Sequence, residues 1–261
     1  MAKVTLIAYT PDPERTVAAA AKLCYSASSV DTLLDNLTPE KTAGFLEMLS
    51  QLGHASPIEH ASFTFGIEGV SRSLLAQITR HRIASFSVKS QRYVRESQFS
   101  YVTPPAIAAC PQARETFQQA MAADQRAYEE LTELLCQQHV AELTGRGVEE
   151  KEARRRAEKM AMEDARFVLP NACETKIVMT MNARSLYNFF AVRGCRRAQW
   201  EIRQLAEEMY RLCLQAAPTL FAKAGPACVD GACPEGKMSC GQAQQVRDTY
   251  RRLRQQAGAE K

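Results

Sequence analysis

Residues 80–92 carry the densest set of chemically useful side chains in the sequence. They contain three arginines, one lysine, one histidine and three serines, with no acidic residue. A guanidinium group binds two oxygens of a phosphate or carboxylate at once, and hydroxyl groups can donate hydrogen bonds to the oxygens that remain. The stretch therefore suits an anionic ligand. A helix that ends near Arg82 would explain the cations equally well, because cations stabilise a helix C-terminus and serines are common in turns.

The element that precedes this stretch would position it. Apolar residues at helical spacing predict a helix after Gly69 that leads directly into Arg80. Gln77 and Arg80 are three residues apart, so on such a helix they would face the same ligand. Three arginines from other segments could support the same anion site: Arg166, Arg184 and Arg193.

A second polar group lies in the loop Gly53–His60, which holds two of the four histidines, one serine and one glutamate. Two histidines and one carboxylate at loop spacing match no closed set of metal ligands. We therefore expect no metal ion at this loop.

The composition is that of an ordinary globular protein, with 261 residues, 46% hydrophobic and 24% charged. A net charge of +4 is too mild for a dedicated nucleic-acid binder, although it allows a local anion site. The segment Lys3–Tyr9 lacks the pattern of an export signal, and no apolar run reaches the length of a membrane span. We expect a cytoplasmic protein with no membrane or nucleic-acid partner.

Nine cysteines are an odd number, and most show no paired spacing, so free thiols in a reducing compartment are expected. Cys228, Cys233 and Cys240 differ, because they lie close together in a tail rich in glycine and proline. Three thiols without a histidine make an incomplete zinc set, which favours a thiol-rich turn without metal. The alternative is a metal site completed by another chain or by a thiol from elsewhere.

Hydrophobic periodicity predicts an α+β fold in a single domain, with a mixed or antiparallel sheet and several long helices. The predicted N-caps are Asp12, Thr38 and Asn182, and the prolines at 104, 105 and 111 predict an extended connection. Predicted strands cover residues 3–9, 63–67 and 175–181. Predicted helices cover residues 13–24, 38–53, 69–80, 112–143, 149–167, 182–194, 196–216 and 242–261.

The sequence lacks a glycine fingerprint for a dinucleotide, a phosphate-binding loop, a nucleophile elbow and a paired-histidine zinc helix. From the residues alone, two functions remain open. The protein could be an enzyme that acts on nucleotides, or a non-catalytic protein that binds phosphorylated ligands or RNA.

Four blocks of sequence resemble the flavin-dependent thymidylate synthases. The first begins Arg80-His81-Arg82, with Ser85, Ser90 and Arg92-Tyr93 at the family's offsets. The others are Gly53–His60, Asn182–Leu186, and Arg193 followed by Ala198–Ile202. The resemblance covers roughly residues 3–222, so it implies a catalytic domain at 1–222 and a cysteine-containing extension at 223–261.

The resemblance implies conversion of dUMP to dTMP, with methylenetetrahydrofolate as carbon donor, FAD as bound cofactor and NADPH as reductant. It also implies a homotetramer with active sites at subunit interfaces. By residue matching, FAD would contact His54, Ser56, Arg80, His81, Arg82, Asn182, Arg184 and Asn188. The matched dUMP contacts are Gln77, Arg80, Ser90, Arg92, Arg166 and Arg193.

Within this match, Arg193 corresponds to the arginine that lies against the uracil and acts in catalysis. No cysteine is needed as nucleophile, and Ser90 is expected to bind the nucleotide because a serine would need a base to attack. The chain departs from the common pattern at Ser87 and Val88, where many members have asparagine and glutamate. Lys89 or a neighbouring backbone group is the expected substitute.

Overall fold

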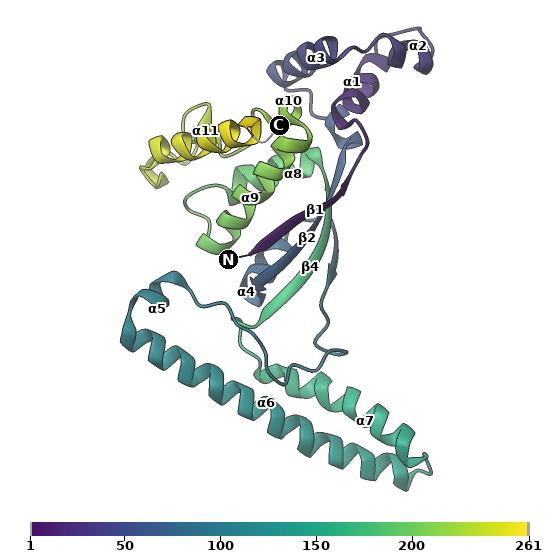
Figure 1. Ribbon diagram of the computed structural model, residues 1–261, viewed down its shortest axis with the longest axis vertical. Coiled ribbons are helices and arrows are strands. Elements are labelled where there is room, and N and C mark those ends of the chain that lie inside the picture. Colours follow the sequence, from purple (N-terminus) through teal and green to yellow (C-terminus); the bar gives the residue numbers. More distant parts are fainter. Residues whose placement is uncertain (1, 260–261) are drawn as a thin grey trace. The chain divides into compact units, whose positions relative to one another are not determined.

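The computed structural model describes residues 2–259, which form two compact units (Figure 1). The smaller unit comprises residues 68–76 and 88–176. The larger unit comprises residues 2–67, 77–87 and the chain from 177 onward. Each unit is therefore assembled from segments that are distant in sequence.

One four-stranded sheet has the strand order β1-β2-β4-β3. Its strands are β1 (Lys3–Tyr9), β2 (Ser62–Ser71), β3 (Ser85–Val88) and β4 (Glu174–Asn182). Three backbone hydrogen bonds join the end of one strand to the start of its neighbour, which makes the pairs antiparallel. They run from Thr10 to Ser62, from Arg72 to Cys173 and from Lys89 to Lys176.

The predicted strands at 3–9, 63–67 and 175–181 are confirmed, and β2 and β4 have the expected alternation. Phe63, Phe65 and Ile67 of β2 are fully buried between more exposed neighbours. Ile177, Met179 and Met181 do the same in β4. The strand β3 was not predicted, because its four residues lie inside the stretch that we interpreted only by its charge.

The larger unit contains most of the helices. Its core includes Phe190 and Phe221 from the helical part, and the two rings meet edge to face at 6.1 Å. Phe221 also meets Phe63 of β2 edge to face at 5.2 Å. The elements are α1 (Pro13–Leu23), α2 (Val30–Asp35), α3 (Pro39–Leu52), η1 (Pro57–His60), α8 (Ala183–Arg193), α9 (Trp200–Ala216), α10 (Pro218–Phe221), η3 (Ala227–Val229), η4 (Gly236–Met238) and α11 (Ala243–Ala259).

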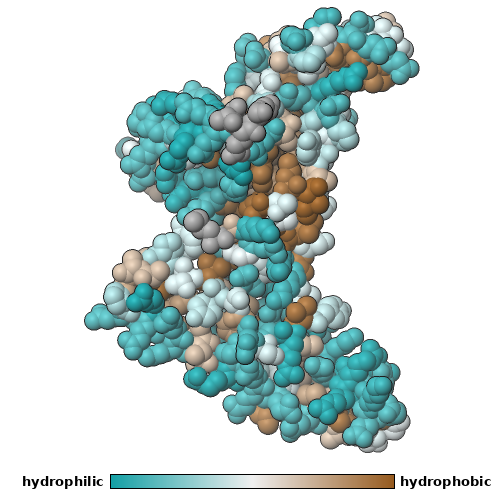
Figure 2. All heavy atoms as spheres, viewed as in Figure 1, coloured by the Kyte–Doolittle hydropathy of each residue, from teal (hydrophilic) through white to brown (hydrophobic). Residues whose placement is uncertain are grey.

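The smaller unit is dominated by two helices that pack side by side, α6 (Pro111–Gly145) and α7 (Glu150–Ala165) (Figure 1). Fully buried alanines at 153, 157 and 161 of α7 share one face, so the helix can approach its partner closely. Figure 2 shows mainly hydrophilic side chains on the visible face of this pair. Both helices were predicted. The proline-marked connection before them instead contains a short helix, α5 (Pro105–Ala109), followed by Cys110 and then α6.

The tail helix α11 packs on α9. The rings of Tyr210 and Tyr250 lie 5.0 Å apart, and Arg254 Nε donates to the Tyr210 hydroxyl at 3.1 Å. Gly225 approaches this contact closely, since a Cβ atom there would meet the Tyr250 ring at 2.6 Å. The C-terminal extension is therefore packed into the larger unit by buried aromatic contacts.

The helix termini confirm two predicted caps and correct one. Thr38 accepts a hydrogen bond from Lys41 N, and Asn182 Oδ1 accepts from Ser185 N at 2.8 Å. Asp12 also precedes its helix, but it has a left-handed backbone and makes no side-chain cap. The helix predicted from residue 196 begins only at Trp200, where Gln199 caps it. Among residues 2–259, no helix has the length and apolar character needed to cross a bilayer.

Candidate active site

The larger unit contains an open cleft of about 570 Å³ lined mainly by cations and amides. Most of the lining comes from two segments, the turn after α4 (Arg72–Ile78) and the helix α8 with its cap, and Glu59 of η1 adds a carboxylate. Seven of the predicted ligand-binding residues line it together: Arg80, His81, Arg82, Asn182, Arg184, Asn188 and Arg193. The structure thus brings together residues that are about a hundred positions apart in the sequence.

The end of α4 determines how the first of these segments enters the cleft. The helix stops at Ile78, and the backbone N–H of His81 then donates to the Ile78 carbonyl at 3.2 Å. The expectation that Gln77 and Arg80 share a helix face is therefore wrong, because Arg80 lies in the turn beyond the helix. What Gln77 contributes to this group is its backbone carbonyl.

Arg193, in the last turn of α8, is held by two hydrogen bonds. Its Nε donates to His81 Nε2 at 3.1 Å, and its Nη2 donates to the Gln77 carbonyl at 3.1 Å. A guanidinium has more N–H donors than these two, so the group is fixed and can still donate to a ligand. Burial, followed by the nearby charge of Arg80, lowers the pKa of Arg193.

His81 must be neutral to accept this hydrogen bond at Nε2. Its ring is half buried and lies edge-on to Phe189 at 5.1 Å. Burial and then the charge of Arg193 lower the pKa of His81 below its ordinary value of 6.5. The histidine therefore acts here as a neutral acceptor that orients an arginine.

The remaining predicted FAD contacts are placed differently. Arg184 forms a short contact with the Glu59 carboxylate, and both side chains are about half exposed, so the pair adds little stability. Arg184 also lines a second cleft, of about 190 Å³, with His54. Ser56 lines neither cleft, and its carbonyl accepts a hydrogen bond from the backbone of Glu59.

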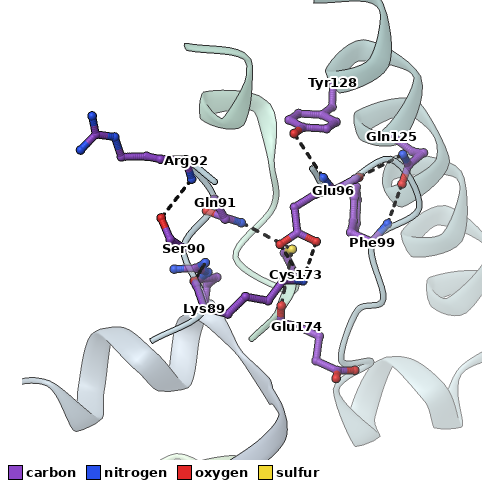
Figure 3. Close-up of polar contacts among 11 residues, drawn as sticks. Lys89, Ser90, Gln91, Arg92, Glu96, Phe99, Gln125, Tyr128, Cys173 and Glu174 are labelled. Atoms are coloured by element: carbon purple, nitrogen blue, oxygen red, sulfur yellow. Dashed lines mark hydrogen bonds and ion pairs between the residues drawn. The ribbon is translucent and has the colours of Figure 1, made fainter. Parts of the chain in front are cut away.

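The smaller unit holds the other predicted nucleotide contacts. Arg92 Nη2 donates to the carboxylate of Glu163 at 2.9 Å, while Arg166 Nε donates to the backbone carbonyl of the same glutamate at 3.0 Å. Ser90 accepts from the backbone N–H of Arg92 at 3.2 Å. Figure 3 shows Ser90 and Arg92 on one short loop, with the Arg92 side chain extending away from it. Glu163 thus joins Arg92 and Arg166 within this unit.

This loop is anchored by a buried ion pair that the sequence did not predict. Lys89 Nζ lies 2.8 Å from Glu96 Oε1 and donates to Oε2 at 2.9 Å, and the Glu96 side chain is only 4% exposed. The Lys89 carbonyl accepts from Arg72 Nη2 at 2.9 Å. Lys89 was an expected substitute near the ligand, but its ammonium is bound to Glu96.

Helix α6 holds the other end of the same loop. Tyr128 accepts a hydrogen bond from the Glu96 N–H at 3.2 Å, and Gln125 accepts one from Phe99 N at 3.1 Å (Figure 3). The Gln125 amide also donates to the Ser97 carbonyl. The 35-residue helix therefore supports the loop that carries Ser90 and Arg92.

Cys173, next to this loop, is not suited to nucleophilic attack. Gln91 Nε2 donates to its sulfur at 3.6 Å. Burial, and then the charge of Glu96, raise the pKa of Cys173 to about 11. The thiol therefore stays protonated at neutral pH, and only the thiolate is a strong nucleophile.

The fold and these sites define an α+β protein with concentrated donors for a phosphorylated ligand. A family model described as thymidylate synthase complementing protein matches residues 5–219. The chain is 54% identical to the flavin-dependent thymidylate synthase of Clostridium tetani over 95% of this chain and 96% of that protein. It is 47% identical to that of Geobacter sulfurreducens, over 96% and 99% of the respective chains. The chain belongs to the flavin-dependent thymidylate synthase family.

We predict that Glu96→Gln lowers the free energy of unfolding by about 2 kcal/mol, because it leaves the Lys89 ammonium without its buried partner. Glu68→Gln is the matched control. It removes the partner of Lys176, from which Glu68 is 2.9 Å away, but both side chains are largely exposed, so the cost should stay under about 0.5 kcal/mol. Urea unfolding measures both variants, and equal costs would contradict a structural role for the buried pair.

We predict that acid destabilises the wild type more than His81→Gln, which keeps an acceptor for Arg193 but cannot titrate. Because the folded pKa of His81 lies below 6.5, the unfolded chain takes up this proton first, and stability falls as the pH drops below that value. Melting temperatures measured from about pH 8 to about pH 5 test this. Parallel curves for the two proteins would refute the neutral-acceptor role, since all other histidines are common to both.

Proposed function

We propose that this protein makes dTMP from dUMP, with methylenetetrahydrofolate as carbon donor, FAD as cofactor and NADPH as reductant. The observation that carries the proposal is the cleft lined by Arg80, His81, Arg82, Arg184 and Arg193, in a chain that belongs to this family. The names of the relatives support thymidylate synthesis with a flavin, and the cationic cleft is consistent with a phosphorylated ligand.

The lining of the cleft suits FAD by its chemistry. A dinucleotide carries a diphosphate, and guanidinium groups bind such oxygens in pairs. Asn182 and Asn188 supply side-chain amides, which can donate hydrogen bonds to a ring system and accept hydrogen bonds from it. We propose that Arg80, His81, Arg82, Asn182, Arg184 and Asn188 hold FAD, with His54 and Ser56 at its periphery. When bound, FAD supplies the hydride-transfer chemistry that the side chains themselves lack.

For dUMP we propose contacts from Gln77, Arg80, Ser90, Arg92, Arg166 and Arg193. Arg193 is the catalytic residue among them. It stays charged, it is held in place by His81, and it can stabilise negative charge that develops on the uracil ring. Ser90 binds the nucleotide, and no cysteine lines the cleft described above.

The assembly and location belong to the same proposal. We propose a homotetramer whose active sites form at subunit interfaces, with a catalytic domain at residues 1–222 and an extension at 223–261. The match of the family model to residues 5–219 supports this boundary. Nine free cysteines support a cytoplasmic protein.

Anaerobic incubation with dUMP, methylenetetrahydrofolate, FAD and NADPH, scored for dTMP, tests the function. The wild type should form dTMP, and Arg193→Ala should turn over about 10²-fold more slowly or worse, because one aimed donor is lost. Ser90→Ala should retain measurable turnover. Arg197→Ala is the matched control, since Arg197 pairs with Glu235 outside the FAD cleft, and it should behave like the wild type. If the wild type formed no dTMP under these conditions, the proposed function would be wrong.

A further inference from the structure

A third cleft of the larger unit, of about 550 Å³, is lined by three cysteines that the proposed reaction does not use. Cys195 comes from the turn directly after α8. Cys228 and Cys233 come from the tail, more than thirty residues later. The fold therefore brings an upstream thiol to the cysteine-rich tail. The three tail cysteines are one ligand short of a four-ligand zinc set, and this thiol could supply it.

The tail segment around these thiols has no apolar core of its own. Between residues 230 and 242, only Cys233 and Cys240 are withdrawn from solvent, and every other residue is exposed. Met238, the largest apolar residue of this segment, is 64% exposed. Hydrophobic burial does not stabilise a segment whose methionine is exposed and whose thiols are its only partly buried side chains. Small structures that lack an apolar core are usually stabilised by disulfides or metal ions.

Cys240 is the third thiol of the tail, seven residues after Cys233, and it is also partly withdrawn from solvent. Its sulfur accepts a hydrogen bond from the backbone N–H of Gln242 at 3.5 Å. Cysteine binds metal ions as the thiolate.

We propose that Cys195, Cys228, Cys233 and Cys240 bind one Zn²⁺ ion as a four-thiolate structural site. Four cysteine ligands make a closed site for zinc, with no position left for substrate. Arg197 and Glu235 line the same cleft but pair with each other, so neither is assigned to the ion. In the described residues no group of three or more such side chains stands at metal-binding geometry. The proposal therefore requires the four side chains to gather around the ion as it binds.

The position of Cys195 gives the ion a structural purpose. Arg193 is the last residue of α8, and Cys195 follows it after a single glycine. An ion shared by Cys195 and the tail would tie the tail to the end of that helix. Near this point the tail is otherwise joined to the chain after α8 by the ion pair between Arg197 and Glu235. Within the tail, the Arg247 side chain donates to the carbonyls of Cys228 and Gly231, both at 3.0 Å.

The test uses full-length protein purified under reducing conditions, with zinc measured by plasma mass spectrometry. We expect about one zinc ion per chain. The double variant Cys233→Ser/Cys240→Ser should retain less than about a tenth of this zinc, since loss of two thiolates opens the site. The matched control is Cys24→Ser/Cys110→Ser, which changes two exposed thiols outside the cleft and should keep the full amount.

A second measurement does not depend on the folding of a variant. Wild-type protein stripped with a chelator and reloaded with Co²⁺ should show the intense absorption of a cobalt ion bound by four thiolates. The melting temperature should fall on stripping and recover with Zn²⁺. Wild-type protein that takes up no zinc when supplied with it, full zinc in the double variant, or iron and sulfide on these thiols would each overturn the assignment.

Discussion

The hydrogen bonds that hold Arg193 are the constraint on which the cleft depends. They exist because α4 ends at Ile78: the last carbonyls of a helix lack partners within it, and the Gln77 carbonyl accepts from Arg193 instead. The same helix end turns His81 toward the cleft, where burial keeps its ring neutral and able to accept. One helix terminus therefore provides both acceptors that orient the guanidinium, while α8, capped by Asn182, carries it.

The cationic stretch at 80–92 is divided in two by its surroundings. Arg80, His81 and Arg82 line a cleft rich in other cations and amides, where an anionic ligand would provide the missing charge. Lys89 and Arg92 instead have carboxylate partners within the chain, Glu96 and Glu163. The cations of the first half face an open cleft, whereas those of the second half already have partners within the protein.

The sequence predicted the elements with strong periodicity and missed those whose signal depends on tertiary contacts. Thr38, Asn182 and the alternation in β2 and β4 are local signals, and each was confirmed. In β3, Phe86 and Val88 also alternate with exposed serines, but four residues are too few to stand out. The burial of Glu96 leaves no local trace, because a glutamate is normally exposed. Its partners follow no regular spacing: Lys89 lies seven residues earlier in the same loop, and Tyr128 lies on α6. Cys195 likewise joins the tail thiols only through the fold.

In the proposed function, the arginine-lined cleft holds a redox cofactor rather than a polyanion. The most direct measurement is the visible absorbance of purified protein supplied with FAD, recorded before and after anaerobic addition of NADPH. The account predicts a yellow protein that retains FAD through gel filtration and is bleached by NADPH, with retention lost in Arg80→Ala/Arg82→Ala. A colourless protein that does not retain FAD but shifts labelled RNA in a salt-dependent way would contradict it.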